Sequence, residues 1–185
     1  MNTYRNLIDL GSYQKGVMNL MDNKCKLSHV TQAYLNTYYT ALHTMIRRMT
    51  RVPLLCSISD TFIQQMIPHH LAANKSISNV QAIQCTCRIL TNTGFERAEY
   101  MKRFEKIAQT MFAAMGAATV TNGVNANFVR EMIPHHEGAV RMSNHVLQFK
   151  ICPELKPILY AIITTQCEGI KQIKKPTKST RSLLR

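Results

Sequence analysis

The sequence predicts an all-α protein, and three observations support this class. Methionine is abundant (11 residues), tryptophan is absent, and glycine and proline are sparse (7 and 6), a mixture that favours helices over strands. Apolar side chains recur at helical spacing, and helix start and stop signals separate the periodic stretches. With 185 residues, of which 45% are hydrophobic, the chain can bury a core as one domain or two small fused ones.

The first predicted helix begins at Ser28, a favoured N-cap residue, and runs to about Arg51, because Pro53 ends it. Its apolar positions follow the helical period: Val30, Ala33, Tyr34, Tyr38, Ala41, Leu42, Met45 and Met49. A second helix is predicted to begin near Ser59 or Asp60 and to carry a pair of histidines.

Residues 1–27 carry little periodic signal and are predicted to form a loosely packed leader with a short helix near residues 16–22. Further along, Thr93 and Glu96 have the spacing of a capping box, in which each residue bonds the other's backbone N–H. This pair predicts a third long helix that runs through about Met115.

A loop rich in Thr, Asn and Gly over residues 119–125 precedes the next predicted helix, which runs to about Lys150. Pro153 and Pro157 then predict a turn, since proline cannot continue a helix that precedes it. A final helix is expected through about Lys174.

The pentapeptide Met-Ile-Pro-His-His occurs twice, at Met66–His70 and at Met132–His136. The offset of 66 residues also relates identical residues upstream: Tyr34 and Tyr100, Thr44 and Thr110, Met45 and Met111, and Met49 and Met115. A fixed period predicts a duplicated supersecondary unit. We expect a truncated first repeat over residues 28–92, a more complete second repeat over residues 93–175, and a basic tail over residues 176–185. The first repeat lacks room for the returning helix of the second.

Methionine and histidine share one face of the second histidine helix. Met132, His135, Ala139 and Met142 fall within an arc of roughly 80°, with His136 about 40° beyond it. Thioethers select soft ions such as Cu(I), and imidazole accepts copper or zinc, whereas magnesium and calcium require oxygen ligands. The motif therefore predicts a soft-metal site, with Cu(I) favoured over Zn(II).

One ion cannot use the whole stripe, because Met132 and Met142 are about 15 Å apart along a helix. Methionines of the preceding helices could supply the missing sulfur. The candidate ligands of the second copy are Met111, Met115, Met132, His135, His136 and Met142, and those of the first are Met45, Met49, Met66, His69 and His70. The competing interpretation is packing, since methionine at helical spacing is a common core residue.

No catalytic apparatus is predicted. The motif lacks the Glu-x-x-His pairs of a di-iron centre, and Ala139 occupies the second histidine position of a zincin. The six cysteines lack the spacing of a zinc site or redox pair and are interpreted mostly as small buried hydrophobes. The sequence therefore indicates a binding protein and not an enzyme.

The net charge of +13 favours phosphate-bearing partners or anionic surfaces, and many of the cations follow Glu168. A rival hypothesis is thus a helical interaction module without metal, whose basic surface or tail docks on an acidic partner, a nucleic acid or a membrane. The chain shows no signal peptide and no transmembrane segment, so we expect a cytoplasmic location. A homo-oligomer is left open.

The repeated motif, followed by a small residue and a later methionine, resembles the domain of unknown function (DUF305) family. The resemblance is strongest over residues 128–142, continues through residues 152–157 to Gln166 and Glu168, and spans about residues 28–175. It implies a ferritin-like, antiparallel four-helix bundle, with copper or silver binding in some members. In the first copy Ser76 replaces the later methionine, which implies a degenerate unit.

The sequence therefore predicts a cytoplasmic copper buffer or tolerance protein. Met132 and His135 are the expected primary ligands, and His136 and Met142 are the expected second-site or exchange ligands. Cytosolic thiols would compete for Cu(I). The chain's own cysteines, Cys85, Cys87, Cys152 and Cys167, could join the site.

Overall fold

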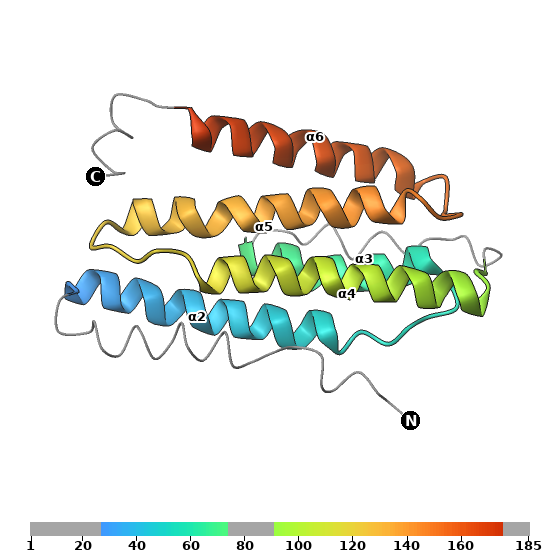
Figure 1. Ribbon diagram of the computed structural model, residues 1–185, viewed down its shortest axis with the longest axis horizontal. Coiled ribbons are helices and arrows are strands. Elements are labelled where there is room, and N and C mark those ends of the chain that lie inside the picture. The colour runs from blue at the N-terminus through green and yellow to red at the C-terminus, as the bar shows by residue number, and fades with distance from the viewer. Residues whose placement is uncertain (1–26, 74–90, 176–185) are drawn as a thin grey trace.

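The computed structural model describes residues 27–73 and 91–175, and every regular element within them is an α-helix (Figure 1). The predicted all-α class is therefore confirmed. No described helix is both long enough and apolar enough to cross a membrane. Several expectations lie outside the described residues: the leader helix, the missing returning helix of the first repeat, Ser76, the basic tail, Cys25, Cys85 and Cys87.

Helix α2, His29–Thr50, confirms the first predicted helix. The Oγ of Ser28 accepts a hydrogen bond from the backbone N–H of Thr31 at 3.2 Å, which satisfies one of the free donors at the helix start. The predicted apolar face is buried in its middle and last turns, at Leu42, Met45 and Met49, together with Leu35 and Ile46. The prediction is wrong for Val30, which is 71% exposed, and for Ala33, which is also exposed, because at 100° per residue both lie outside the buried stripe.

Helix α3, Ile58–Ala73, begins close to the predicted start. Asn92 holds this end in place. Its Oδ1 accepts from the backbone N–H of Ile58 at 2.9 Å, and its Nδ2 donates to the carbonyl of Lys150 at 3.0 Å. One buried amide therefore links the start of α3 to a segment far along the chain.

Helix α4, Gly94–Gly116, opens with the predicted capping box. The Oγ1 of Thr93 accepts from the backbone N–H of Glu96 at 3.2 Å, and the Glu96 carboxylate accepts from the backbone N–H of Thr93 at 2.8 Å. Two donors that the first turn leaves free are thus satisfied reciprocally. These bonds confirm both the helix and its predicted starting point.

Helix α5, Val124–Val146, carries the second histidine pair and ends before the expected Lys150. The chain leaves the helix through a tightened turn. Here the backbone N–H groups of Gln148 and Phe149 bond carbonyls only three residues back, at 3.1 and 3.2 Å. Such bonds commonly close the last turn of an α-helix, and they explain why the predicted boundary is too late.

Helix α6, Leu155–Lys174, matches the predicted final helix. The expectation that Pro157 belongs to the preceding turn is wrong, because Pro157 lies in the first turn of the helix. Proline is tolerated there, since a backbone N–H at that position has no intrahelical acceptor to lose. The turn instead contains Pro153, whose carbonyl accepts from the backbone N–H of Lys156 at 3.2 Å.

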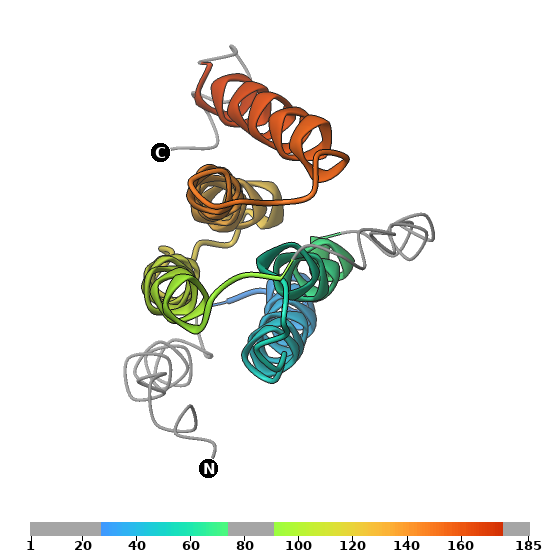
Figure 2. The ribbon, with the colours of Figure 1, turned by 90° about the vertical axis from the view of Figure 1, so that its right-hand side faces the viewer.

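The helices form two antiparallel hairpins, α2 with α3 and α4 with α5, and α6 packs against α5 on the outside of this bundle (Figures 1 and 2). This arrangement is consistent with a ferritin-like bundle of four helices plus one outer helix. The core contains methionine and aromatic side chains from all five helices or the segments beside them, including Met45, Met49, Met66, Tyr100, Met111, Phe112, Met115, Met142 and Leu159.

Two tyrosines connect one hairpin to the other, Tyr100 fully buried and Tyr34 partly buried. The hydroxyl of Tyr100 on α4 donates to Oε1 of Gln65 on α3 at 2.7 Å. The hydroxyl of Tyr34 on α2 donates to the carboxylate of Glu131 on α5. Tyr34 and Tyr100 are 66 residues apart, as are Gln65 and Glu131. Equivalent positions of the two sequence repeats therefore make equivalent contacts in opposite directions.

Helices α4 and α5 approach closely at Gly138. An ideal Cβ placed on this glycine would lie 2.2 Å from Sδ and 2.6 Å from Cγ of Met111, which real contacts do not allow. Met111 thus packs directly onto the backbone of α5, and it can do so only because residue 138 has no side chain.

Gly138→Ala is predicted to lower the free energy of unfolding by about 1–3 kcal/mol, because Met111 must leave its place against α5. Equilibrium urea denaturation measures this difference. In a Met111→Ala background the same change should cost less, or even stabilise, because alanine is the better helix former. The control is Gly94→Ala, where nothing lies within 4 Å of the added methyl group. Equal effects of the two glycine changes would contradict the packing argument.

Candidate metal centre

The two histidine motifs meet where α3 passes α5. The imidazole rings of His69 and His135 stack, with centroids 4.0 Å apart and an interplanar angle of 22°. The Nε2 of His135 lies 3.4 Å from the carbonyl oxygen of His69. These two residues occupy the same position in the repeated pentapeptide. The sequence predicted two separate sites and not this contact, although the common offset of all paired positions was a signal that could have revealed it.

Both stacked histidines are removed from water. His69 is 0% exposed and His135 is 3% exposed. Neither ring nitrogen of His69 has a hydrogen-bond partner among the described residues, and Nδ1 of His135 also lacks one. Buried nitrogens without a hydrogen-bond partner cost free energy, and in native proteins they commonly have a functional role or bind water or an ion.

Desolvation keeps these imidazoles neutral. Burial lowers the pKa of His69 well below its ordinary value, and the neighbouring His135 lowers it further. Burial likewise lowers the pKa of His135 to about 4, with His136 acting in the same direction. At neutral pH both rings therefore carry a nitrogen lone pair that is free of a proton, which is the form that binds metal ions.

The second histidine of each motif lies nearer the surface. The His70 ring is 5.4 Å from that of His69, and the His136 ring is 5.9 Å from that of His135. Burial lowers the pKa of both outer residues. Helix α6 covers His136, since a Cβ added at Gly169 would lie 3.1 Å from its Nδ1. The four imidazoles thus form one cluster, with two rings inside and two at its edge.

The candidate thioethers differ in their burial. Six of them are at most 3% exposed: Met45, Met49, Met66, Met111, Met115 and Met142. Met132 is only partly buried, although its equivalent Met66 is buried. The predicted face of α5 is confirmed at His135, Ala139 and Met142, and its first member lies at the edge. Met111 faces α5, as the sequence analysis expected, because its sulfur rests on Gly138.

The four imidazoles are not arranged to coordinate one metal ion. Within residues 27–73 and 91–175, no three His, Cys, Asp or Glu side chains are arranged to hold a metal ion. Imidazole binds metal in the plane of its ring, so two stacked rings direct their lone pairs side by side and not toward a common point. An ion would therefore require thioether ligands, a rotation of one ring, or both. Which of the candidate residues bind metal stays a prediction.

The cysteine interpretation holds for one of the three described cysteines. Cys152 is buried, and its backbone N–H donates to the Oγ of Ser59 at 3.0 Å. Cys167 is partly buried, and Cys56 is exposed. The expectation of a buried residue is wrong for Cys56, because it lies in the connection between α2 and α3 and not on a helix face.

Glu131 is a second feature that the repeated motif does not reveal, because the first copy has Gln65 in its place. Glu131 is 2% exposed, and its carboxylate accepts the hydroxyl of Tyr34. Burial raises its pKa to about 7, although the Tyr34 hydrogen bond acts in the opposite direction. A carboxyl that is half-protonated near neutral pH therefore lies one turn before His135.

Comparison with protein families finds a match for the second half of the chain. Residues 89–177 match the DUF305 family model, described as a domain of unknown function. The DUF305 match covers α4, α5 and α6, so it includes the second histidine pair and the outer helix. The family resemblance is thereby confirmed for this part of the chain. No curated protein and no solved structure matches the chain.

Glu131→Gln is predicted to remove a pH-dependent loss of stability. The folded pKa of about 7 exceeds the ordinary value of 4.5, so the neutral carboxyl stabilises the fold fully below pH 4.5 and this contribution is lost as pH rises through 7. Between pH 5 and 8 the wild type should lose on the order of 2 kcal/mol relative to the variant. Urea denaturation across this range measures the difference, and a difference that does not change with pH would contradict the argument.

Acid should weaken the fold through His135. Its folded pKa of about 4 lies below the ordinary 6.5, so the neutral ring's contribution is complete above pH 6.5 and is lost as pH falls toward 4. His135→Leu should reduce the loss of unfolding free energy between pH 6.5 and 4.5 by on the order of 2 kcal/mol. The comparison is His29→Leu at an exposed position of α2. The same acid sensitivity in both variants would exclude a dominant role for His135.

Proposed function

We propose that this protein binds Cu(I) in a single centre to which both histidine motifs contribute. The observation that carries the proposal is the pair of stacked imidazoles, His69 and His135, which are buried, neutral and without partners at three ring nitrogens. A bound ion would satisfy nitrogens that the described residues leave without hydrogen bonds. The centre is thus shared between α3 and α5 and is not two separate sites.

The surrounding chemistry favours a soft ion. Met111 packs on α5 close to His135 in sequence, and the residues that the structure describes include no metal-holding group of carboxylates, so magnesium and calcium fit poorly. His69 and His135 are the proposed nitrogen ligands, Met111 and Met132 are candidate sulfur ligands, and His70 and His136 are exchange ligands at the edge. Zinc is the second choice, because imidazole accepts it and thioether does not favour it.

The pairing of equivalent positions supports a further element of the proposal. We infer that residues 28–92 are a degenerate copy of the DUF305 domain that matches over residues 89–177. Supporting this are the common offset and the two tyrosine contacts, Tyr34 with Glu131 and Tyr100 with Gln65. In this proposal the first copy serves mainly to deliver His69 to a centre built around His135.

As a cellular role we propose buffering of copper, or tolerance to it, in the cytoplasm. A site of imidazole and thioether ligands holds Cu(I) less firmly than a thiolate site, because thiolate is the softer anionic ligand. Such a site releases its ion readily to competing thiols. This property suits a buffer that exchanges copper and does not suit a permanent store.

An anaerobic titration of Cu(I) against a chromophoric chelator tests the proposal, with Zn(II) run in parallel. The full chain should bind one Cu(I) and bind Zn(II) more weakly. His69→Leu and His135→Leu should each lower the Cu(I) affinity at least about tenfold while preserving an apolar, buried position. His29→Leu, which changes an exposed histidine, should bind as the wild type does.

The stoichiometry separates a shared centre from independent ones. Two ions per chain, with one lost in each single variant, would overturn the shared centre but keep copper binding. Wild-type affinity in the double variant His69→Leu and His135→Leu would overturn the metal assignment itself. Circular dichroism of each variant establishes that a loss of binding is not a loss of fold.

A further inference from the structure

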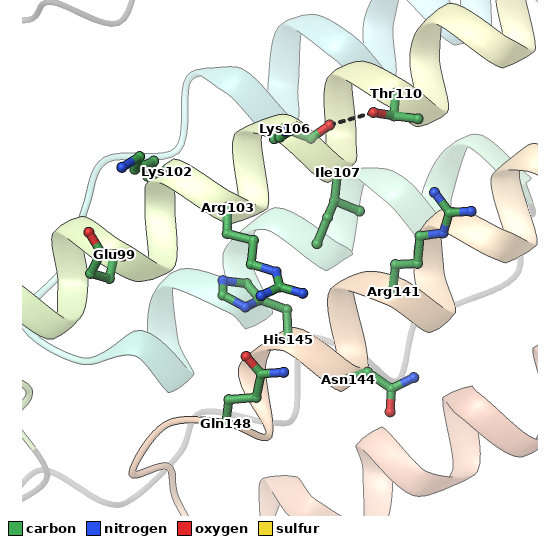
Figure 3. Close-up of a pocket in the computed structure, with 10 residues that line it drawn as sticks. All are labelled: Glu99, Lys102, Arg103, Lys106, Ile107, Thr110, Arg141, Asn144, His145 and Gln148. Carbon is green, nitrogen blue, oxygen red and sulfur yellow. Dashed lines mark hydrogen bonds between the residues drawn. The ribbon is translucent and has the colours of Figure 1, made fainter.

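A groove between α4 and α5 lies apart from the histidine cluster and plays no part in the proposed copper centre. Its volume is about 640 Å³. Lys102, Arg103 and Lys106 line it from α4, and Arg141 lines it from α5. Figure 3 shows the guanidinium groups of Arg103 and Arg141 in the space between the two helices. Cationic side chains from two different helices therefore converge on one hollow.

The positive charge of this groove is not neutralised within the described residues. Four cationic side chains face a single carboxylate, Glu99, and none of the four forms an ion pair in residues 27–73 and 91–175. Among the described residues, the ion pairs are those of Lys171 with Glu168 within α6 and of Lys174 on α6 with Glu137 on α5. Four uncompensated cations that are held close together repel one another, and a bound anion would relieve that repulsion.

The remaining lining identifies the kind of anion. Thr110, Asn144 and Gln148 add hydrogen-bonding groups, and Ile107 is the one aliphatic residue of the lining. No aromatic side chain other than the imidazole of His145 lines the groove, so it offers little surface on which a nucleobase could stack. Arginine guanidinium groups bind phosphate through two parallel hydrogen bonds, and lysine adds point charge.

The size of the groove favours a compact ligand. Its volume falls within the range of about 300–1,000 Å³ that is usual for small-molecule sites. The cations also lie on both walls of one hollow, Arg103 on α4 and Arg141 on α5. Charges on facing walls can contact a short chain of phosphates from both sides. The backbone of a nucleic-acid duplex is extended and would meet only part of them.

We propose that the α4–α5 groove binds a compact oligophosphate, either inorganic triphosphate or the triphosphate group of a nucleotide. Arg103 and Arg141 bind the phosphate groups from opposite walls of the groove. Lys102 and Lys106 neutralise the remaining negative charge of the oligophosphate. The groups recognised in either ligand are the phosphates. This site depends on no metal ion.

Isothermal titration calorimetry of the full chain with inorganic triphosphate tests the proposal. ATP and a short DNA duplex are titrated in parallel. Triphosphate should bind saturably at one site. The double variant Arg103→Gln and Arg141→Gln should lose at least about tenfold in affinity. The matched control is Arg47→Gln with Arg48→Gln, exposed residues at the end of α2, which removes the same net charge from another surface.

The outcomes separate the sources of the ligand. Equal affinity for triphosphate and ATP supports recognition of the phosphate chain alone, and tighter binding of ATP supports a nucleotide as its source. Equal losses in the groove and control variants would show a response to net charge only and would overturn the site. Binding of the duplex without binding of triphosphate would also overturn it. Circular dichroism of both double variants excludes unfolding as the cause of a loss.

Discussion

The packing of α3 against α5 at the stacked histidines is the contact on which the rest of the molecule depends. It buries two imidazoles, and burial is tolerated only while both rings stay neutral. The same contact joins the two hairpins, together with the methionine and aromatic core that they share and buried polar bonds such as that from Tyr100 to Gln65. The imidazoles of the candidate site therefore also contribute to the packing of the bundle.

Local signals explain why the helices could be predicted from the sequence. The N-cap at Ser28 and the capping box of Thr93 with Glu96 depend on residues a few positions apart, so the sequence alone contains them. The end of α5 and the place of Pro157 were harder, because a tightened last turn and a first-turn proline differ little in sequence from a break.

The candidate site was predictable in its members and not in its geometry. Periodicity placed His135 and Met142 on one buried face, yet it contains no information on which helix lies opposite. The stack of His69 on His135 spans 66 residues, and so does the relation between Gln65 and Glu131. Comparing the repeats as spatial partners, and not as separate sites, would have brought these residues together.

Contacts between the two hairpins span a longer stretch of sequence than contacts within each hairpin, and this difference affects the order of folding. Contacts within a hairpin join neighbouring stretches of chain, whereas the bond from Tyr34 to Glu131 closes a separation of 97 residues. Closing a longer loop costs more chain entropy and contributes to slower folding. Each hairpin should therefore form early, and docking of α3 on α5 should come last. The histidine cluster would then be completed only in the final step of folding, so a partly folded chain lacks the stacked imidazoles of His69 and His135.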